Sequence, residues 1–422
     1  MNVGCPEPID SARDNLREGT RIAVLKFGGT SVATREDRTV AYRRVRDALE
    51  AGFATVTVVS AMGRSPEAYA TDTLLRLIDG RTGSSNSDLL LAAGELIAAS
   101  VFAEELCDEG VEAIALSGAQ AGIVTDARHG DATILRVEPR AITELLERNV
   151  VPVVAGFQGA AEDGSITTLG RGGTDLSAIA IGHALEAQRV DVYTDVSGAM
   201  TADPRRVPSA RTIERASLAE MAELANQGAT VMHHKAAEYA NRTATRYTVK
   251  GLRSDRGTFV DERADADRPV TGVTATGRVT WVRIIRGDIE SPKRRMETEL
   301  EMFRRFAAEQ ISIDQVTINQ AGVAFVVEGD RGNEVRRLLG DLNLAVRVRE
   351  GCSKLSIVGN GMRGTPGVVH RVVDALSRAD VEIIHCTDSN ITISILVPAD
   401  HVTRAERAVH EQFELDKGDP VP

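Results

Sequence analysis

The sequence predicts an α/β protein in which a three-layer αβα domain with a mainly parallel sheet is followed by two smaller α+β modules. The chain has 422 residues, which is too long for one hydrophobic core. From Ile22 to about Gly257, short apolar runs alternate with amphipathic stretches, as in parallel sheets with crossover helices. A polar, proline-containing segment at residues 261–272 then indicates a domain boundary, and the chain beyond it repeats itself.

The first domain is expected to bury several short strands that end in glycine or hydroxyl turns. The first is IAVLKF, which runs into GGTSV, and the next are ATVTVVSAMG, AIALSGAQAG, VVPVVAGFQG and RVDVYTDVSG. The segment DLLLAAGELIAASVFAEEL places apolar residues three and four apart and predicts a helix. In open parallel sheets, ligands collect at the carboxyl ends of the strands. The functional site is therefore expected at these turns.

The second half of the chain contains a repeat with an offset of 70 residues. Residues 306–314, FAAEQISID, align with residues 376–384, LSRADVEII, and the same offset aligns 323–327, VAFVV, with 393–397, ISILV. Two copies of a βαββαβ-like module explain this pattern. The predicted organisation is a flexible extension at 1–20, a first domain at 21–262, and modules at 271–345 and 346–416.

Composition argues against nucleic-acid and membrane partners. With 61 acidic and 50 basic residues, the formal charge is −11, which repels nucleic-acid backbones and anionic membranes. No apolar run approaches the roughly 20 residues that a membrane helix needs, and the first residues do not read as a signal peptide. The four cysteines are scattered without a CxxC pair, so a reduced, cytoplasmic compartment is expected. His233 and His234 are adjacent and point in different directions, so no metal site is predicted.

Two glycine turns carry a cation each. Lys26 precedes the glycines of KFGGTSV, and Arg171 lies between glycines in TTLGRGGTD. Such turns bring backbone amides close to an anion, and together the two cations could stabilise a phosphoryl group during transfer. Neither turn is a Walker A loop, and no GxGxxG follows the first strand. The alternatives are that Lys26 is solvated beside a plain turn, and that Thr174 or Asp175 only caps a helix.

The order of these motifs resembles the aspartate kinases of the amino acid kinase superfamily. KFGGTSV, VVSAMG, LLLAAGE, VVAGFQG, TTLGRGGTD, YTDVSG and TADPR occur at similar spacing, and the repeat resembles the paired ferredoxin-like ACT modules of these enzymes, with GMRGTPGVV opening the second. The resemblance implies transfer of phosphate from MgATP to the β-carboxylate of L-aspartate, giving 4-phospho-L-aspartate for lysine, threonine and methionine synthesis. It also implies control by an amino-acid effector (lysine, threonine or diaminopimelate) and a homodimer formed through the ACT modules.

Residue roles follow from the resemblance. Lys26 would stabilise the transferring phosphoryl group, Arg171 would clamp the α-carboxylate of aspartate, and Asp175 would organise the lysine. Aspartate binding is expected at Thr71, Glu95, Arg171, Gly172, Gly173 and Thr174, where Glu95 would meet the ammonium group. ATP binding is expected at Lys26, Phe27, Gly28, Gly29, Ser60, Thr194, Asp195, Met200, Asp203 and Arg205. Effector binding is expected at Asp314, Gln315 and Asn390.

Some features depart from the family pattern. GATVMHHKA stands where GAKVLHPRA is usual, so Thr230 replaces a lysine that contacts phosphates and His234 replaces a proline; Lys235 is a possible substitute for that charge. TVKGLRS also departs from the usual valine-arginine-serine strand. These departures leave a non-catalytic sensor open as an alternative function. A kinase of the same fold for another acidic amino acid, such as glutamate, is a second alternative. Glu95 could also be an ordinary helix glutamate, and Asp314 a solvated turn residue.

Overall fold

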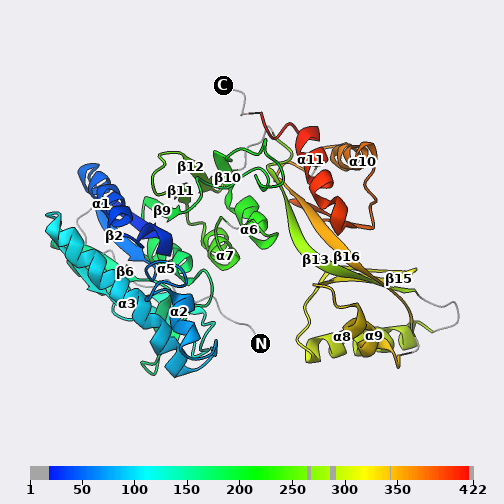
Figure 1. The fold of residues 1–422 in the computed structure, drawn as a ribbon, viewed down its shortest axis with the longest axis horizontal. Coiled ribbons are helices and arrows are strands. Elements are labelled where there is room, and N and C mark those ends of the chain that lie inside the picture. The colour runs from blue at the N-terminus through cyan, green and yellow to red at the C-terminus, as the bar shows by residue number, and fades with distance from the viewer. Residues whose placement is uncertain are drawn as a thin grey trace. The chain divides into compact units, whose positions relative to one another are not determined.

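Two compact units make up the part of the chain that the computed structural model describes (Figure 1). The described residues are 19–229, 231–263, 268–285, 291–342, 344–362 and 364–417. Most of the predicted extension at 1–20 lies outside them. The first unit contains residues 19–199, 212–225 and 231–263, and the second contains residues 200–211, 226–229 and everything described from residue 268 onward.

The first unit is built on an eight-stranded sheet in the order β10-β12-β11-β9-β1-β2-β6-β3. Its pairings are parallel except that β11 runs antiparallel to β12, which confirms the predicted mainly parallel sheet. Every residue of the central strand β1 is buried. The strands are β1 (Ile22–Phe27), β2 (Ala54–Val59), β3 (Ala113–Leu116), β6 (Val151–Ala155), β9 (Arg189–Thr194), β10 (Arg215–Ser217), β11 (Tyr247–Gly251) and β12 (Gly257–Asp261).

Helices cover both faces of this sheet, so the predicted three layers are present. On one face, α1 (Arg35–Glu50) and α3 (Ser85–Asp108) pack through Tyr42 and Phe102 against alternate residues of β1 and β6 and against Val59 of β2. On the other face lie α4 (Arg140–Glu147), α5 (Gly173–Ala184) and α7 (His234–Thr243). The shorter elements are η2 (Gly29–Ser31), α2 (Thr71–Arg76) and α6 (Leu218–Asn226).

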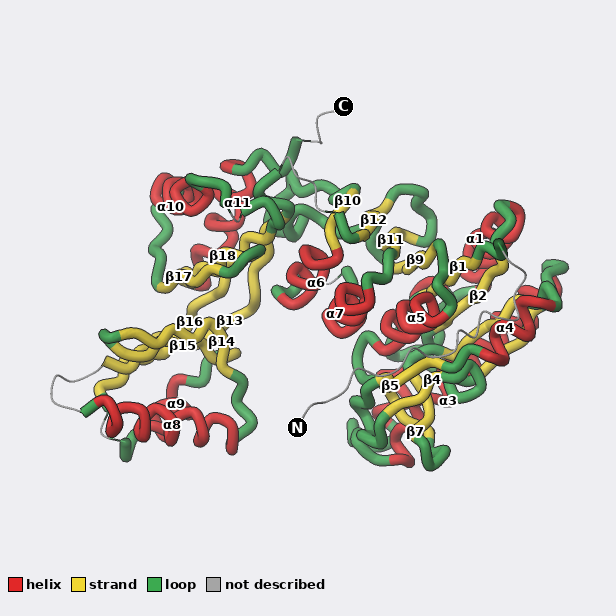
Figure 2. The backbone as a smooth tube through the Cα atoms, turned by 180° about the vertical axis from the view of Figure 1, so that it is seen from behind, coloured by secondary structure: helices red, strands yellow, loops and turns green. Residues whose placement is uncertain are grey.

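A second, four-stranded sheet in the first unit was not predicted. Its order is β5-β4-β7-β8, and it lies beside α3 (Figure 2). Its strands have only three or four residues each, too few to show a clear alternation in the sequence. They are β4 (Ile123–Thr125), β5 (Ile134–Val137), β7 (Gln158–Ala161) and β8 (Ile166–Thr168).

The second unit is built on a six-stranded sheet in the order β14-β15-β13-β16-β18-β17. The predicted repeat is visible in its elements, because β15 (Gly322–Glu328) and β18 (Thr392–Pro398) differ by 70 residues at both ends. The last residues of α8 and α10 are also 70 positions apart, and so are the first residues of α9 and α11. The remaining elements are β13 (Gly272–Ile285), α8 (Pro292–Ala308), β14 (Ile313–Asn319), α9 (Gly332–Leu339), β16 (Ala345–Val358), α10 (Val368–Arg378), β17 (His385–Asp388), η3 (Ala399–His401) and α11 (Val402–Gln412).

Each copy of the repeat has its own hydrophobic core, and we call the two copies module 1 and module 2. Module 1 packs α8 and α9 on β14 and β15, and module 2 packs α10 and α11 on β18. The long strands β13 and β16 serve both: Val282 and Ile284 belong to the first core, whereas Val273 and Leu355 belong to the second. The modules therefore interlock, and the boundary proposed between residues 345 and 346 falls at the start of a shared strand.

Candidate active site

A buried ion pair joins the first strand to the helix that follows the arginine turn. Lys26 is the penultimate residue of β1 and is only 7% exposed. Its Nζ lies 2.6 Å from Oδ1 of Asp175 in the first turn of α5. A buried ammonium needs such a partner, because removing it from water is costly. The alternative of a solvated Lys26 is therefore wrong.

The turn after β1 is in close contact with the turn after β2. The amide of Gly63 donates to the carbonyl of Gly29 at 3.0 Å, and the amide of Ser60 donates to the carbonyl of Phe27 at 3.1 Å. A Cβ on Gly29 would lie 2.7 Å from the carbonyl oxygen of Ala61, so only glycine fits. The ring of Phe27 is buried in the core, which leaves only its backbone at the site.

Glu95 lies on α3 beside these turns and is fully buried. Its Oε1 accepts hydrogen bonds from the amide of Ala61 at 3.3 Å and from Oγ1 of Thr71 at 3.4 Å. No residue in the described ranges hydrogen-bonds its Oε2. Burial raises the pKa of Glu95 to about 8. The side chain is therefore not an ordinary exposed helix glutamate, and its free oxygen can accept a bond from a ligand cation.

The turn GRGGTD brings Arg171 to the start of α5. Gly172 is the N-cap in a left-handed conformation with φ of 76°, and a Cβ there would lie 2.1 Å from Cβ of His233. Thr174 and Asp175 lie inside the helix, so the alternative that either residue caps it is wrong. Arg171 is exposed, and no carboxylate among the residues described pairs with it. Its guanidinium is free to bind an anion.

The residues predicted to bind ATP divide between the two units. Thr194 ends β9, and its Oγ1 donates to Asp195 at 3.1 Å. Arg64, which the sequence analysis missed, lies 2.7 Å from the same carboxylate. Met200, Asp203 and Arg205 lie instead on a segment that belongs to the second unit. There the Arg205 guanidinium, 2.8 Å from Asp203, holds the pKa of that carboxyl below its usual range.

Two residues near α7 bear on the departures from the family pattern. Thr230 lies outside the described residues. Lys235 forms an ion pair with Asp131 and lies 3.4 Å from the carbonyl oxygen of Leu169, so its charge lies beside the arginine turn. The described ranges contain no group of three or more histidine, cysteine, aspartate or glutamate side chains that could hold a metal ion.

Phe157, which was not among the residues singled out in the sequence, packs beside the arginine turn. It follows β6 with a φ of 67°, unusual for a residue other than glycine, and its amide donates to Oγ of Ser177 at 3.1 Å. A Cβ on Gly173 would lie 2.9 Å from its ring. Phe157 therefore packs against the arginine turn, and the motif VAGFQG was the available signal.

The predicted regulatory residues lie in the second unit. Asp314 forms an ion pair with the largely buried Lys354 of β16 and accepts a bond from the amide of Gln315 at 2.7 Å. Gln315 also donates through Nε2 to Oγ1 of Thr387 in β17 at 3.3 Å, while its buried Oε1 has no partner in the described part. Asn390 is exposed in the turn after β17, and no described contact joins it to this group.

Comparison with known proteins assigns the family. A model of the amino acid kinase family matches residues 21–250, and an ACT domain model matches residues 355–413. The chain is 38% identical over 408 residues to Aspartokinase 1 of Bacillus subtilis (strain 168), covering 94% of this chain and 100% of that protein. The chain belongs to the aspartokinase family. The motif resemblance and the predicted fold are thus confirmed.

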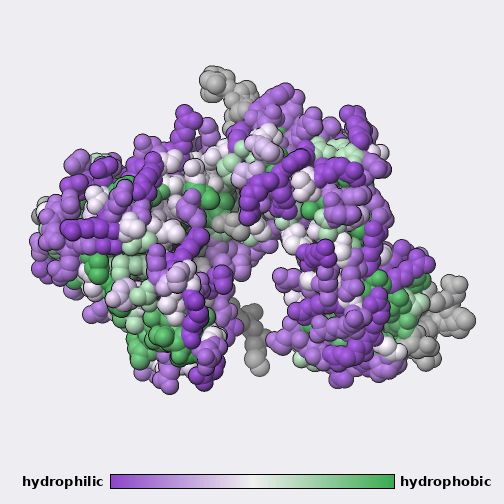
Figure 3. Space-filling view, in the orientation of Figure 1, coloured by the Kyte–Doolittle hydropathy of each residue, from purple (hydrophilic) through white to green (hydrophobic). Residues whose placement is uncertain are grey.

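Solved aspartokinase structures share the fold along nearly the whole chain. E. coli aspartokinase III in complex with aspartate and ADP aligns with a TM-score of 0.74 at 25% identity, covering 93% of this chain and 99% of that one. The same protein in complex with lysine and aspartate aligns with a TM-score of 0.70 at 25% identity and the same coverage. No helix in the described ranges is long and apolar enough to cross a membrane, and hydrophilic residues cover most of the face drawn in Figure 3.

Proposed function

We propose that this member of the aspartokinase family transfers the γ-phosphoryl group of MgATP to the β-carboxylate of L-aspartate. The observation that carries the proposal is the buried pair of Lys26 and Asp175, which holds an ammonium group 2.6 Å from its counterion at the carboxyl edge of the sheet. Parallel sheets bind ligands at this edge. The related E. coli enzyme has been crystallised with aspartate and ADP, which supports the same substrates here.

The site provides the charges that this reaction requires. Glu95 offers a buried carboxyl oxygen for the substrate ammonium, and Arg171 offers a free guanidinium for the α-carboxylate. The β-carboxylate is ionised at neutral pH, so it attacks the γ-phosphorus without a general base. The bond from this phosphorus to the bridging oxygen breaks and ADP leaves. Lys26 stabilises the negative charge of the phosphoryl group during its transfer. Mg²⁺ enters with ATP, because it is held largely by phosphates and water.

The test of this proposal is acyl-phosphate formation, trapped as the hydroxamate. Wild-type protein with MgATP and L-aspartate should give product, and Lys26→Met should give at least about 100-fold less, the loss expected when one group that stabilises the transition state is removed. Parallel reactions with L-glutamate show whether the protein forms more acyl phosphate from aspartate than from another acidic amino acid. Binding of ADP without product from either amino acid would refute the kinase and favour the sensor.

We also propose that an amino-acid effector binds the modules near Asp314 and Gln315. A ligand there would find the ammonium of Lys354, the carboxylate of Asp314 and the free Oε1 of Gln315, which are complementary to the charges of an amino acid. The E. coli relative has been crystallised with lysine. Titration of the activity with lysine, threonine and diaminopimelate identifies the effector, and no response to any of the three would contradict this assignment.

A homodimer formed through the modules is the third part of the proposal. The outer face of α8 exposes Met296 and Leu300, and the edge strand β14 exposes Val316 and Ile318. Exposed apolar side chains on a sheet edge favour association with another chain. Light scattering should give a mass of about twice the 45.2 kDa of one chain, and Leu300→Lys with Ile318→Lys should shift the protein to monomers.

A further inference from the structure

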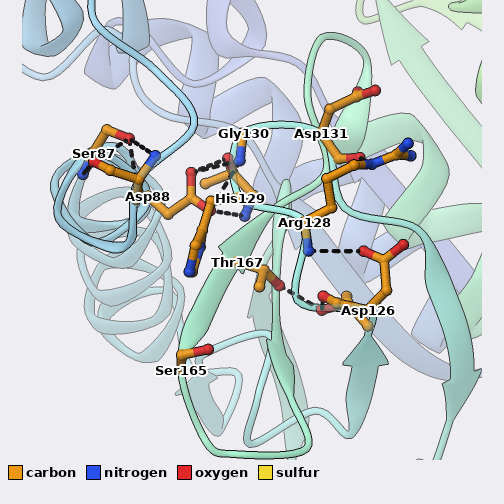
Figure 4. Close-up of polar contacts among 12 residues, drawn as sticks. Ser87, Asp88, Asp126, Arg128, His129, Gly130, Asp131, Ser165 and Thr167 are labelled. Carbon is orange, nitrogen blue, oxygen red and sulfur yellow. Dashed lines mark hydrogen bonds and ion pairs between the residues drawn. The ribbon is translucent and has the colours of Figure 1, made fainter.

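One buried carboxylate outside the predicted site gathers donors from two separate segments. Asp88 lies in the first turn of α3 and is fully buried. Its carboxylate accepts hydrogen bonds from Oγ1 of Thr168 at 2.6 Å and from the amide of Thr168 at 3.0 Å. It also accepts a hydrogen bond from the amide of Gly130 at 3.0 Å and lies 2.9 Å from Nδ1 of His129 (Figure 4). An ionised carboxylate only accepts hydrogen bonds, so it can satisfy both backbone amides at once.

Both segments border the arginine turn. Thr168 is the last residue of β8 and is followed directly by Leu169, Gly170 and Arg171. Gly130 and Asp131 lie in the hairpin between β4 and β5, and a Cβ on Gly170 would lie 2.5 Å from Oδ1 of Asp131 and 3.3 Å from the carbonyl oxygen of Gly130. The hairpin therefore packs directly against the first glycine of the turn, and any shift of β8 or of the hairpin moves Arg171.

The same helix carries both Asp88 and Glu95. They are seven residues apart, which is nearly two helical turns, so they lie on the same side of α3. Glu95 reaches the turn after β2 through the amide of Ala61, whereas Asp88 reaches the strand that leads to Arg171. α3 thus connects rigidly to both ends of the proposed amino-acid site.

We propose that Asp88 is a positioning residue that holds Arg171 at a fixed place relative to Glu95 and Lys26. This inference rests on the proposed function. With the α-carboxylate clamped by Arg171 and the ammonium by Glu95, the length of the substrate side chain decides whether its carboxylate reaches the γ-phosphate beside Lys26. Asp88 therefore contributes to the selection of aspartate over its longer homologue glutamate without touching the substrate.

Two substitutions test this role. Asp88→Asn replaces an acceptor oxygen with an NH₂ group that faces other donors, and Thr168→Val removes only the 2.6 Å hydroxyl bond. A displaced positioning group costs on the order of 100-fold in kcat/KM when the shift is about 1 Å. We expect Asp88→Asn to lower kcat/KM for aspartate about 100-fold and Thr168→Val about 3- to 10-fold. KM for ATP should stay within about twofold, and the preference for aspartate over glutamate should fall in both variants.

Glu220→Gln is the matched control. Glu220 is a buried carboxylate that accepts bonds from the amide and hydroxyl of Ser217, both at 2.8 Å, at the start of α6. Ser217 ends β10, which forms the edge of the main sheet, four strands from β1. This variant should lower the melting temperature and leave KM for aspartate and the substrate preference unchanged.

The outcomes separate this inference from the proposed function. If Asp88→Asn does not fold, Thr168→Val still tests the positioning role of Asp88. A wild-type enzyme that is active on aspartate, with a Thr168→Val variant that keeps the wild-type KM and preference, would overturn the positioning role alone. Absence of acyl phosphate in the wild-type protein would overturn both proposals.

Discussion

The raised pKa of Glu95 predicts that aspartate binding strengthens as the pH rises. With a pKa of about 8, about a tenth of the free protein carries an ionised Glu95 at pH 7 and about nine-tenths at pH 9. Only the ionised form can pair with the substrate ammonium, and the apparent dissociation constant is the intrinsic one divided by the competent fraction. The dissociation constant for aspartate should therefore fall about tenfold between pH 7 and pH 9, or about 1.4 kcal/mol.

Calorimetric titration of aspartate in the presence of ADP measures this dependence, because binding at pH 7 should also release a proton from Glu95. Glu95→Gln mimics the neutral carboxyl, so its profile should be flat. Its affinity should be about 10- to 100-fold weaker than that of the ionised wild type, because a hydrogen bond to a charged group contributes about 1.5 to 3 kcal/mol. Glu220→Gln, which removes a buried carboxylate at the start of α6, should keep the wild-type profile. A Glu95→Gln variant with wild-type affinity at pH 9 would refute the assignment of Glu95 to the ammonium.

Three other predictions concern separate parts of the molecule. Lys26→Met should lower kcat at least about 100-fold while ADP binding, measured by calorimetry, weakens far less; an equal loss of both would assign Lys26 to ground-state binding. Asp314→Asn, which weakens the ion pair with Lys354, should raise the half-inhibiting effector concentration about tenfold without changing the uninhibited rate, and an unchanged inhibition curve would contradict the effector site. Burial raises the pKa of Glu406 to about 7. The stability that its protonated form contributes is therefore complete below the ordinary pKa of a glutamate and is lost as the pH rises through about 7. Denaturant titration should show the free energy of unfolding fall by about 1 kcal/mol between pH 6 and pH 8 in the wild type, and by less in Glu406→Gln.

The features that the sequence predicted are those with a regular local pattern. The strand runs that end in glycine turns became β1, β2, β3, β6 and β9 of the main sheet, and the offset of 70 residues became the matching pair β15 and β18. The pairing of Lys26 with Asp175 was expected from the family resemblance, and the structure has it at the carboxyl edge of the main sheet.

The features that the sequence missed depend on contacts between distant segments. The hairpin that packs against Gly170 comes from strands of three and four residues, and the only signal for Asp88 was a carboxylate at the start of a helix, where acidic residues are common because of the helix dipole. Arg64 is exposed and meets Asp195 only in three dimensions. The repeat in the sequence likewise gives no sign that β13 and β16 are each shared by both modules.

The segment Met200–Arg211 belongs to the second unit, although part of it is expected from the family resemblance to bind ATP. It carries Met200, Asp203 and Arg205, which the family resemblance assigns to ATP, yet it packs within the second unit. There Thr201 bonds to His410 of α11 at 2.9 Å, and Arg206 pairs with the buried Glu406 of the same helix at 2.9 Å. A ligand shifts an equilibrium only through different affinities for the two states. We therefore expect an effector to move this segment only if it has different affinities for two arrangements of the segment and α11 within the second unit.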